Sequence, residues 1–473
     1  MRSQDLTAYI DSVWAQDVVP TLCDYIEVPN LSQAFDPAWA EHGHMDQVVE
    51  MFARWASARN IEGMSVDVVP LEGATPVIVC EIPAHPDALS DKTVLLYGHL
   101  DKQPEMQGWD DGKGPWTPVV EDGRLYGRGG ADDGYAMFAA LTAVEALVGA
   151  GGLHSRLIVL IEAGEESGSP DLAAHVDNLA HRLGDVDLVV CLDSGAADYD
   201  AMWVTTSLRG LVSGTLHVQV TDQGLHSGSA SGVVPSSFRI LRTLIERVED
   251  SATGHIRLPE LHAEIPADVV AKAAQAAPLL AHEVVGALPF SGSTRPVDGD
   301  IVELILNRTW RPALSVVGLG GAPQPGDAGN VLRPHTSAKL SFRLPPTVDP
   351  EAAAQAVSRA LTEDPPYSAT VEFDDAEHGP GWAAPLLDEW LAQALDQASE
   401  RHFGRRAGFQ GEGGSIPFMG MLGAKFPGAQ FVITGVLGPE SNAHGPNEFL
   451  HLDTAKNLTA CVAEILDAHA SRS

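Results

Sequence analysis

The sequence lacks several features that would assign it to a specialised class of protein. No run of about 18 or more apolar residues occurs in the 473 residues, so we expect no membrane-spanning helix. Residues 1–17 carry acids and have no apolar core of the kind that a secretory signal has, which favours a cytoplasmic location. The four cysteines form no Cys-x-x-Cys pair, which is typical of buried thiols in a reducing compartment: Cys23, Cys80, Cys191 and Cys461.

Positive charge is also scarce. The 64 acidic residues outnumber the 29 lysines and arginines, which gives a formal net charge of -35. Such a surface repels nucleic acid and anionic membranes, so we expect neither as a partner. The excess of acids either keeps the protein soluble, which is the interpretation we favour, or steers cationic substrates and metal ions to it.

Two common catalytic motifs are missing. The stretch GRGGADDG is rich in glycine, but it lacks the Lys-Ser/Thr of a phosphate loop and does not follow the dinucleotide-binding pattern. Ser227 and Ser415 lie near glycines, yet neither forms the Gly-x-Ser-x-Gly turn of a serine hydrolase. The sequence therefore favours neither a nucleotide-binding enzyme nor a serine hydrolase.

What the sequence does contain is an alternation of short apolar runs and helical segments. Runs that end in polar or turn-forming residues predict buried strands, among them TVLLYGHLD, LIVLIEAGEE, DLVVCLDSG and QFVITGVLG. Apolar spacing predicts helices at about residues 4–27, 39–59, 136–148, 171–183 and 386–402. This order predicts an α/β fold with a mixed, largely parallel sheet flanked by helices.

The pattern changes between about residues 208 and 382. LVSGTLHVQVT and SAKLSFRLP alternate as half-buried antiparallel strands do, and two amphipathic helical segments lie between or after them. An α+β domain inserted into the α/β domain explains this change. We therefore expect residues 1–207 and 385–473 to form one catalytic domain, and residues 208–384 to form the insertion.

Carboxylates and imidazoles follow the predicted strands. His99 ends one apolar run, Glu165–Glu166 and Asp193 follow two others, Asp132 lies in the glycine-rich loop, and His444 comes shortly after the QFVITG run. Each residue alone is commonly a surface or loop residue, but the carboxyl ends of parallel strands meet at one edge of a sheet. Nitrogen and oxygen ligands suit zinc, manganese or cobalt, and the absence of thiolates argues against a structural zinc site. Two close ions need a carboxylate that both can share.

Asp101 follows His99 after one spacer residue. Its carboxylate is placed to accept the second ring N–H of the histidine, as carboxylates do behind metal-bound histidines.

Nine ordered stretches carry a resemblance to a known family. They are YGHLDKQP, GRLYGRGGADDG, IEAGEESGSPDL, CLDSG, GLHSGSASG, NVLRP, SFRLPP, GEGGSIPFM and SNAHGPNEF. In this order they resemble the carnosinase and non-specific dipeptidase branch of the zinc aminoacylase and exopeptidase family. The resemblance implies a zinc-peptidase α/β domain with an inserted lid and dimerisation domain, and a homodimer.

The resemblance also implies roles for the metal-site residues. His99 and Asp193 would bind one ion, Glu166 and His444 would bind the other, and the carboxylate of Asp132 would bridge the two ions. The peptide bond between Asp132 and Asp133 would be cis. Asp101 would orient His99, and Glu165 would be the general base. Zinc is the ion expected first, with manganese or cobalt as alternatives.

Further residues match groups that touch the substrate in the family. His226 matches a lid histidine that reaches the partner subunit's site and stabilises the oxyanion. Arg343 and the loop of Gly413, Gly414 and Ser415 match the groups that hold the free carboxylate of the substrate. Asn330 and His378 match less well-defined substrate positions. The chain departs from the family after the Asp pair, where Gly134 stands in place of the usual lysine, and this leaves the substrate open.

The sequence thus predicts a dinuclear metal-dependent hydrolase that cleaves dipeptides or short peptides. An N-acyl- or N-carbamoyl-amino-acid amidohydrolase is the alternative on the same scaffold. A metal-dependent binding protein without activity is a third possibility, but it would have no use for Glu165 beside Glu166.

Overall fold

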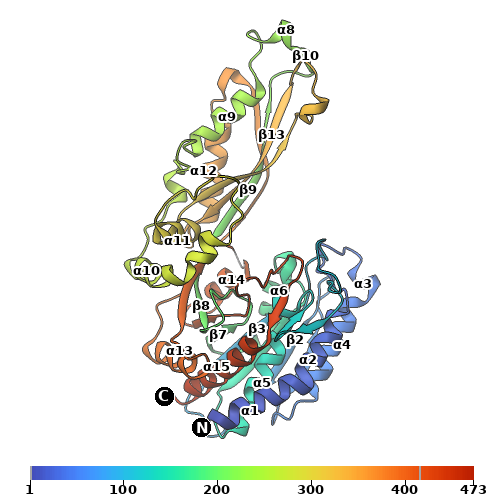
Figure 1. Ribbon diagram of the computed structural model, residues 1–473, viewed down its shortest axis with the longest axis vertical. Helices are drawn as coiled ribbons and strands as arrows, with labels where there is room; N and C mark the ends of the chain where they lie inside the picture. Colours follow the sequence, from blue (N-terminus) through green and yellow to red (C-terminus); the bar gives the residue numbers. More distant parts are fainter. Residues whose placement is uncertain (1–2, 415–416, 473) are drawn as a thin grey trace. The chain divides into compact units, whose positions relative to one another are not determined.

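The computed structural model describes residues 3–414 and 417–472. Its internal contacts divide the chain into two compact units, drawn in Figure 1. The first unit contains Met1–Thr206, Ala384–Gln410 and Met421–Ser473, and the second contains Ser207–Ala383 and Gly411–Gly420. Residues 411–420, which the sequence analysis assigned to the catalytic domain, therefore group with the inserted segment.

A large mixed sheet lies mainly in the first unit. Its strands follow the order β1-β2-β6-β3-β7-β17-β8-β15, with β16 paired to β8. The four central strands β6, β3, β7 and β17 are parallel, and the flanking pairs are antiparallel. Every residue of β3 is buried, as its continuous apolar sequence predicts. The strands are β1 (Ser65–Val69), β2 (Val77–Ile82), β3 (Thr93–His99), β6 (Arg156–Glu162), β7 (Val186–Cys191), β8 (Trp203–Leu208), β15 (Trp382–Ala383), β16 (Gly408–Glu412) and β17 (Gln430–Ile433).

Helices pack around this sheet and bury one large apolar core. Helix α5 is apolar on all sides and nearly all of it is buried, and α1 and α15 pack against it (Figure 1). The helices of the first unit are α1 (Ser3–Val13), α2 (Val19–Ile26), α3 (Trp39–His42), α4 (His44–Ser57), α5 (Ala136–Gly149), α6 (Leu172–Asn178), α7 (Ala180–Leu183), α13 (Glu389–His402) and α15 (Leu452–Ala470). Helix α14 (Pro417–Lys425) follows β16 in the chain.

A small three-stranded sheet in the first unit joins two distant parts of the chain. Strand β5 (Arg124–Tyr126) pairs with β4 (Val119–Glu121) on one side and with β18 (Phe449–His451) on the other. Strand β5 leads into the glycine-rich loop that contains Asp132, and β18 follows the loop that contains His444. The pairing of β5 with β18 therefore brings these two loops to the same place.

The second unit has its own four-stranded antiparallel sheet, in the order β11-β13-β9-β14. Alternate residues of β13 are buried, as in a strand with one face covered. Helices α9 and α12 pack on the sheet and complete a separate core. The elements are β9 (Gly210–Gln219), β10 (Leu225–His226), α8 (Ser227–Ala230), α9 (Ser237–Val248), α10 (Ala267–Ala281), α11 (Ile301–Thr309), β11 (Ala313–Gly320), β12 (Val331–Leu332), β13 (His335–Leu344), α12 (Pro350–Thr362) and β14 (Thr370–Gly379).

Candidate metal centre

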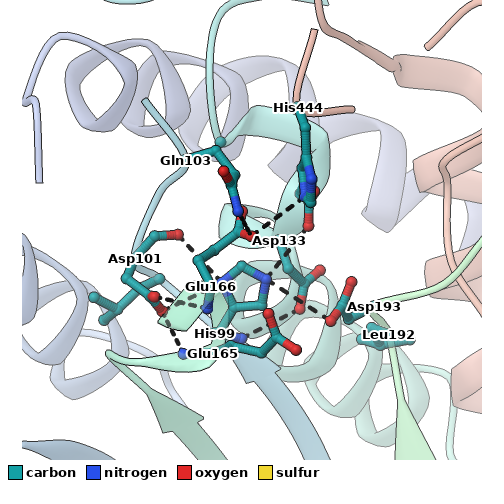
Figure 2. A network of polar contacts seen from close by, with 12 residues as sticks. His99, Asp101, Gln103, Asp133, Glu165, Glu166, Leu192, Asp193 and His444 are labelled. Carbon is teal, nitrogen blue, oxygen red and sulfur yellow. Dashed lines mark hydrogen bonds and ion pairs between the residues drawn. The ribbon is translucent and has the colours of Figure 1, made fainter. Parts of the chain in front are cut away.

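Three neighbouring parallel strands of the first unit end at one cluster of polar side chains (Figure 2). His99 is the last residue of β3, and its side chain is fully buried. Glu165 and Glu166 begin a single 3-10 turn, Glu165–Ser167, shortly after β6, and Asp193 lies two residues beyond β7. The carboxyl ends of β6, β3 and β7 thus bring these residues together, as the sequence predicts.

Asp132 enters the cluster from the glycine-rich loop. The peptide bond between Asp132 and Asp133 is cis, as the family resemblance implies. Asp133 is buried beside strand β3, where one carboxylate oxygen accepts the backbone N–H of His99 at 3.3 Å. A Cβ atom on Gly98 would lie 2.7 Å from the same carboxylate oxygen and 2.4 Å from the Cβ of Ala136, so the strand needs glycine there.

The carboxylate of Asp132 lies between two histidines. Its Oδ1 is 3.4 Å from His99 Nε2, and its Oδ2 is 3.0 Å from His444 Nε2. Asp193 lies on the His99 side, and its Oδ2 is 3.8 Å from His99 Nε2. Glu166 lies on the His444 side, and its Oε2 is 3.2 Å from His444 Nε2. This arrangement matches two neighbouring ion positions that share one carboxylate.

A buried ring nitrogen in this cluster lacks a hydrogen-bond partner among the described residues. His99 Nε2 is shielded from solvent and makes no hydrogen bond within the part of the chain that the structure describes. An unsatisfied buried polar atom is costly, and this one faces two carboxylates. A divalent cation satisfies such a nitrogen and neutralises the carboxylates, so the residues fit a metal site.

The electrostatics of the cluster also favour a cation. Hydrogen bonds to Asp132 and Glu166 raise the pKa of His444 to about 11. Burial opposes ionisation of Asp132, but the hydrogen bond from His444 and the charge of the nearby His99 hold the pKa of Asp132 well below its usual value. The raised pKa of His444 and the lowered pKa of Asp132 both mean that the carboxylates attract positive charge to the space between them.

Glu165 has a different environment from Glu166. Burial raises the pKa of Glu165 well above its usual value, and repulsion from Asp193 adds to this. Burial also raises the pKa of Glu166, but a hydrogen bond with His444 opposes the rise. A glutamate with a raised pKa beside a cation site is suited to accept and return a proton near neutral pH.

A family comparison agrees with this chemistry. A model of the peptidase family M20/M25/M40 matches residues 95–468, which is well over half of the chain. The chain belongs to this peptidase family. The match includes the cluster from His99 to His444 and the whole of the second unit.

Individual M20/M25/M40 relatives cover the chain to different extents. A cysteinylglycine-S-conjugate dipeptidase of Corynebacterium striatum is 26% identical over 440 residues, which are 88% of this chain and 89% of the relative. A Beta-Ala-His dipeptidase of Mus musculus is 29% identical over 294 residues, which are 60% of this chain and 58% of the relative. The solved structure of the di-peptidase Dug1p of Saccharomyces cerevisiae shares the fold with a TM-score of 0.77 at 23% identity, over 100% of this chain and 99% of that one.

Asp101 contacts more of the cluster than His99 alone. Its two carboxylate oxygens accept the backbone N–H groups of Glu165 at 3.1 Å and Glu166 at 3.0 Å. The Nδ1 atom of His99 lies 3.2 Å from the backbone carbonyl of Asp101 and 3.4 Å from the carboxylate. Asp101 therefore contacts the histidine and also holds the turn that carries both glutamates.

Two residues next to Asp101 were not recognised from the sequence. Gln103 donates a hydrogen bond from its side-chain amide to Glu166 Oε2 at 2.7 Å (Figure 2). Lys102 is fully buried, and its Nζ donates to the backbone carbonyls of Tyr25 and Val28, each at 2.7 Å. Both residues lie in the stretch DKQP, which carries part of the family resemblance. Their partners could not be predicted, because these are distant in the sequence and are brought close only by the fold.

The expected substrate-contacting residues lie in the second unit, in two groups. Arg343 of β13 pairs with Leu211 of β9, and His378 of β14 pairs with the next residue of β9. The carbonyl of Gly414 accepts the backbone N–H of Arg209, just before β9. Arg343, His378 and Gly414 therefore surround the beginning of one strand, while Ser415 lies outside the described residues.

The second group is formed by His226 and Asn330. His226 ends β10 and pairs with Val331 of β12, and the carbonyl of Asn330 accepts the backbone N–H of Ser227 at 2.9 Å. Both side chains are exposed.

The described helices include none that is long and apolar enough to cross a bilayer.

Proposed function

We propose that this protein is a dinuclear metal-dependent peptidase that hydrolyses dipeptides or short peptides. The observation that carries the proposal is Asp132, whose two oxygens face His99 on one side and His444 on the other. Membership of the M20/M25/M40 family supports peptidase chemistry, and relatives that are named dipeptidases support the substrate class.

The distances around Asp132 support an assignment of ligands to the two ions. One ion would be held by His99, Asp193 and Asp132, and the other by His444, Glu166 and Asp132. The ions would supply a Lewis acid for the peptide carbonyl and lower the pKa of a water molecule. The donor set of imidazoles and carboxylates favours zinc, with manganese or cobalt as the alternatives.

Glu165 is assigned the proton transfers. Its raised pKa and its place beside His99 and Asp193 allow it to take a proton from the attacking water and to deliver it to the leaving amine. Its neighbour Glu166 bonds with His444 instead, so the two adjacent glutamates have separate tasks. A protein that only bound metal would not need Glu165.

Residues of the second unit are assigned to the substrate. Arg343 and Gly414 would hold its free carboxylate, because an arginine fork and backbone groups suit that anion. Asn330 and His378 would add polar contacts. His226 would stabilise the oxyanion in the site of a second subunit, which requires a homodimer.

A substrate panel tests the proposal. Metal-stripped protein, restored separately with zinc, manganese and cobalt, is assayed on dipeptides, N-acyl amino acids and N-carbamoyl amino acids. Dipeptide hydrolysis that needs an added ion and exceeds the other two activities supports the proposal. Preference for N-acyl or N-carbamoyl substrates would reassign the protein as an amidohydrolase. No hydrolysis with any ion would favour a binding role.

A further inference from the structure

A buried arginine outside the ligand set connects the loops of the candidate metal centre. The guanidinium of Arg128 is almost completely buried and uses three nitrogens on three acceptors. Nη1 lies 2.5 Å from the carboxylate of Glu448, Nη2 donates to the carbonyl of Gly445 at 3.0 Å, and Nε donates to the carbonyl of Pro104 at 3.2 Å. The other oxygen of Glu448 accepts the backbone N–H of Gly129 at 2.9 Å.

Each acceptor belongs to a segment that carries part of the centre. Gly445 is the residue after His444, and Pro104 follows Gln103, whose amide holds Glu166. Arg128 itself stands four residues before Asp132. The side chain of Arg128 therefore joins the segment of the bridging carboxylate to the segment of His444 and to the segment of Gln103, which bonds Glu166.

His444 depends on such a connection more than the other histidine does. His99 is buried at the end of a central strand, whereas the side chain of His444 is 55% exposed and lies on a loop. The backbone of this loop has positive φ at Asn442, His444 and Asn447. An exposed loop has few packing contacts to hold a ring in place, so fixed hydrogen bonds must supply the rigidity.

We propose that Arg128 is a positioning residue for the ion site on the His444 side, and that Glu448 holds Arg128 in place for this task. The inference rests on the proposed metal centre and adds to it a residue that touches neither ion nor substrate. Arginine is required because its rigid planar fork reaches acceptors in three directions, whereas lysine offers one flexible ammonium group.

The competing explanation is that Arg128 and Glu448 are only a buried ion pair that affects stability. Removing one member of such a pair leaves an uncompensated buried charge and destabilises the protein, but removing both charges is often tolerated. The double variant Arg128→Met/Glu448→Gln removes both charges and keeps a side-chain oxygen for the N–H of Gly129. If the pair only stabilises the fold, this variant binds ions as the wild type does.

The test is a metal titration on four proteins and one control variant. Wild type, Arg128→Lys, the double variant and His444→Ala are stripped of metal and titrated with Co²⁺, with calorimetry and visible absorption as readouts. The matched control is Arg156→Lys, because Arg156 also bonds a carboxylate, Glu81, at 2.8 Å and a carbonyl, that of Leu183, at 3.1 Å. Arg156 begins β6, at the opposite end of that strand from the glutamate turn.

We expect two binding steps in the wild type. In Arg128→Lys and in the double variant, the step that His444→Ala weakens should weaken about tenfold or more, with a changed cobalt spectrum, while the other step stays within about threefold. Arg156→Lys should bind both ions as the wild type does. If Arg128→Lys does not fold, the double variant decides the question.

Two results would overturn the inference. Wild-type affinity for both ions in the folded Arg128 variants would show that Arg128 does not position the site, and it would leave the proposed function intact. Fewer than two binding steps in the wild type would instead remove the dinuclear centre, and the inference with it.

Discussion

The carboxylate of Asp101 accepts the backbone N–H of Glu166 at 3.0 Å. Its second oxygen accepts the N–H of Glu165 at 3.1 Å, and His99 lies within 3.4 Å of the same carboxylate. The end of β3 is thus tied to the turn after β6 through one fully buried side chain. A proposed ligand of each ion and the proposed base are held by a residue that binds no ion itself.

Asp101→Asn tests this connection. Asparagine can offer one carbonyl oxygen, but its NH₂ group would face the N–H of either Glu165 or Glu166, so one hydrogen bond is lost and a repulsive contact replaces it. We expect metal affinity or kcat to fall about 10- to 100-fold. Ion titration and steady-state kinetics measure both, with exposed Asp111→Asn as the control. Unchanged affinity and kcat would show that Asp101 is dispensable.

The placement of the main cluster could be predicted from the sequence because it follows from local pattern. His99, Glu165 and Asp193 all come at or just after apolar runs, and parallel strands bring such ends together. The contacts of Asp101 with two backbone N–H groups could not be predicted, because they depend on the path of the turn after β6. The pairing of Arg128 with Glu448 could not be predicted either, because the two residues are 320 positions apart in the sequence.

The fold was predictable to a similar extent. The central strand β3 and helix α5 have continuous apolar sequences and were located within a residue or two. Helices α10 and α11 of the second unit were not predicted. The grouping of residues 411–420 with the second unit depends on tertiary contacts that no local pattern records.

Glu165→Gln separates proton transfer from metal binding. Glutamine has nearly the same shape but cannot accept the proton of water, so we expect kcat to fall about a hundredfold or more with both ions retained. Elemental analysis and kinetics on the same sample measure this. The matched variant is Glu166→Gln, which should lose affinity for one ion. Near wild-type activity in Glu165→Gln with two ions bound would assign the base to another group.

The raised pKa of Glu162 predicts that the free energy of unfolding depends on pH. This glutamate is buried at the end of β6, where it accepts hydrogen bonds from the hydroxyls of Tyr97 and Ser169. Burial raises its pKa from 4.5 to about 7, although the bond from Tyr97 opposes the rise. The folded state therefore binds the proton more tightly than the unfolded state, and the stabilising contribution is complete below about pH 4.5 and lost as the pH rises through about 7.

Glu162→Gln removes this titration. As the pH rises from 4.5 to 7, we expect the wild type to lose up to about 3 kcal/mol of unfolding free energy relative to the variant. Urea unfolding with chelator in every sample measures the difference without a contribution from ions. Exposed Glu105→Gln is the control. A difference that does not vary with pH would mean that Glu162 is ionised throughout.

The role proposed for His226 predicts complementation between subunits. His226→Ala should bind ions normally and lose about 10²- to 10³-fold in kcat, because one donor to the oxyanion is gone. Mixed dimers of His226→Ala with Glu165→Gln should regain activity, since one site of each pairs an intact base with an intact histidine. Verified mixed dimers without recovered activity would leave His226 as an ordinary exposed residue at the end of β10.

The most direct test of the account is a titration of metal-free protein with zinc while dipeptide hydrolysis and bound ions are measured together. The wild type should bind two ions per chain and gain its activity as the second ion binds. His444→Ala should keep one strong site and lose most activity, and Asp132→Ala should lose both sites, because its oxygens face both histidines. Full binding of two ions by both variants, or hydrolysis at the wild-type rate without any ion, would contradict a dinuclear centre bridged by Asp132.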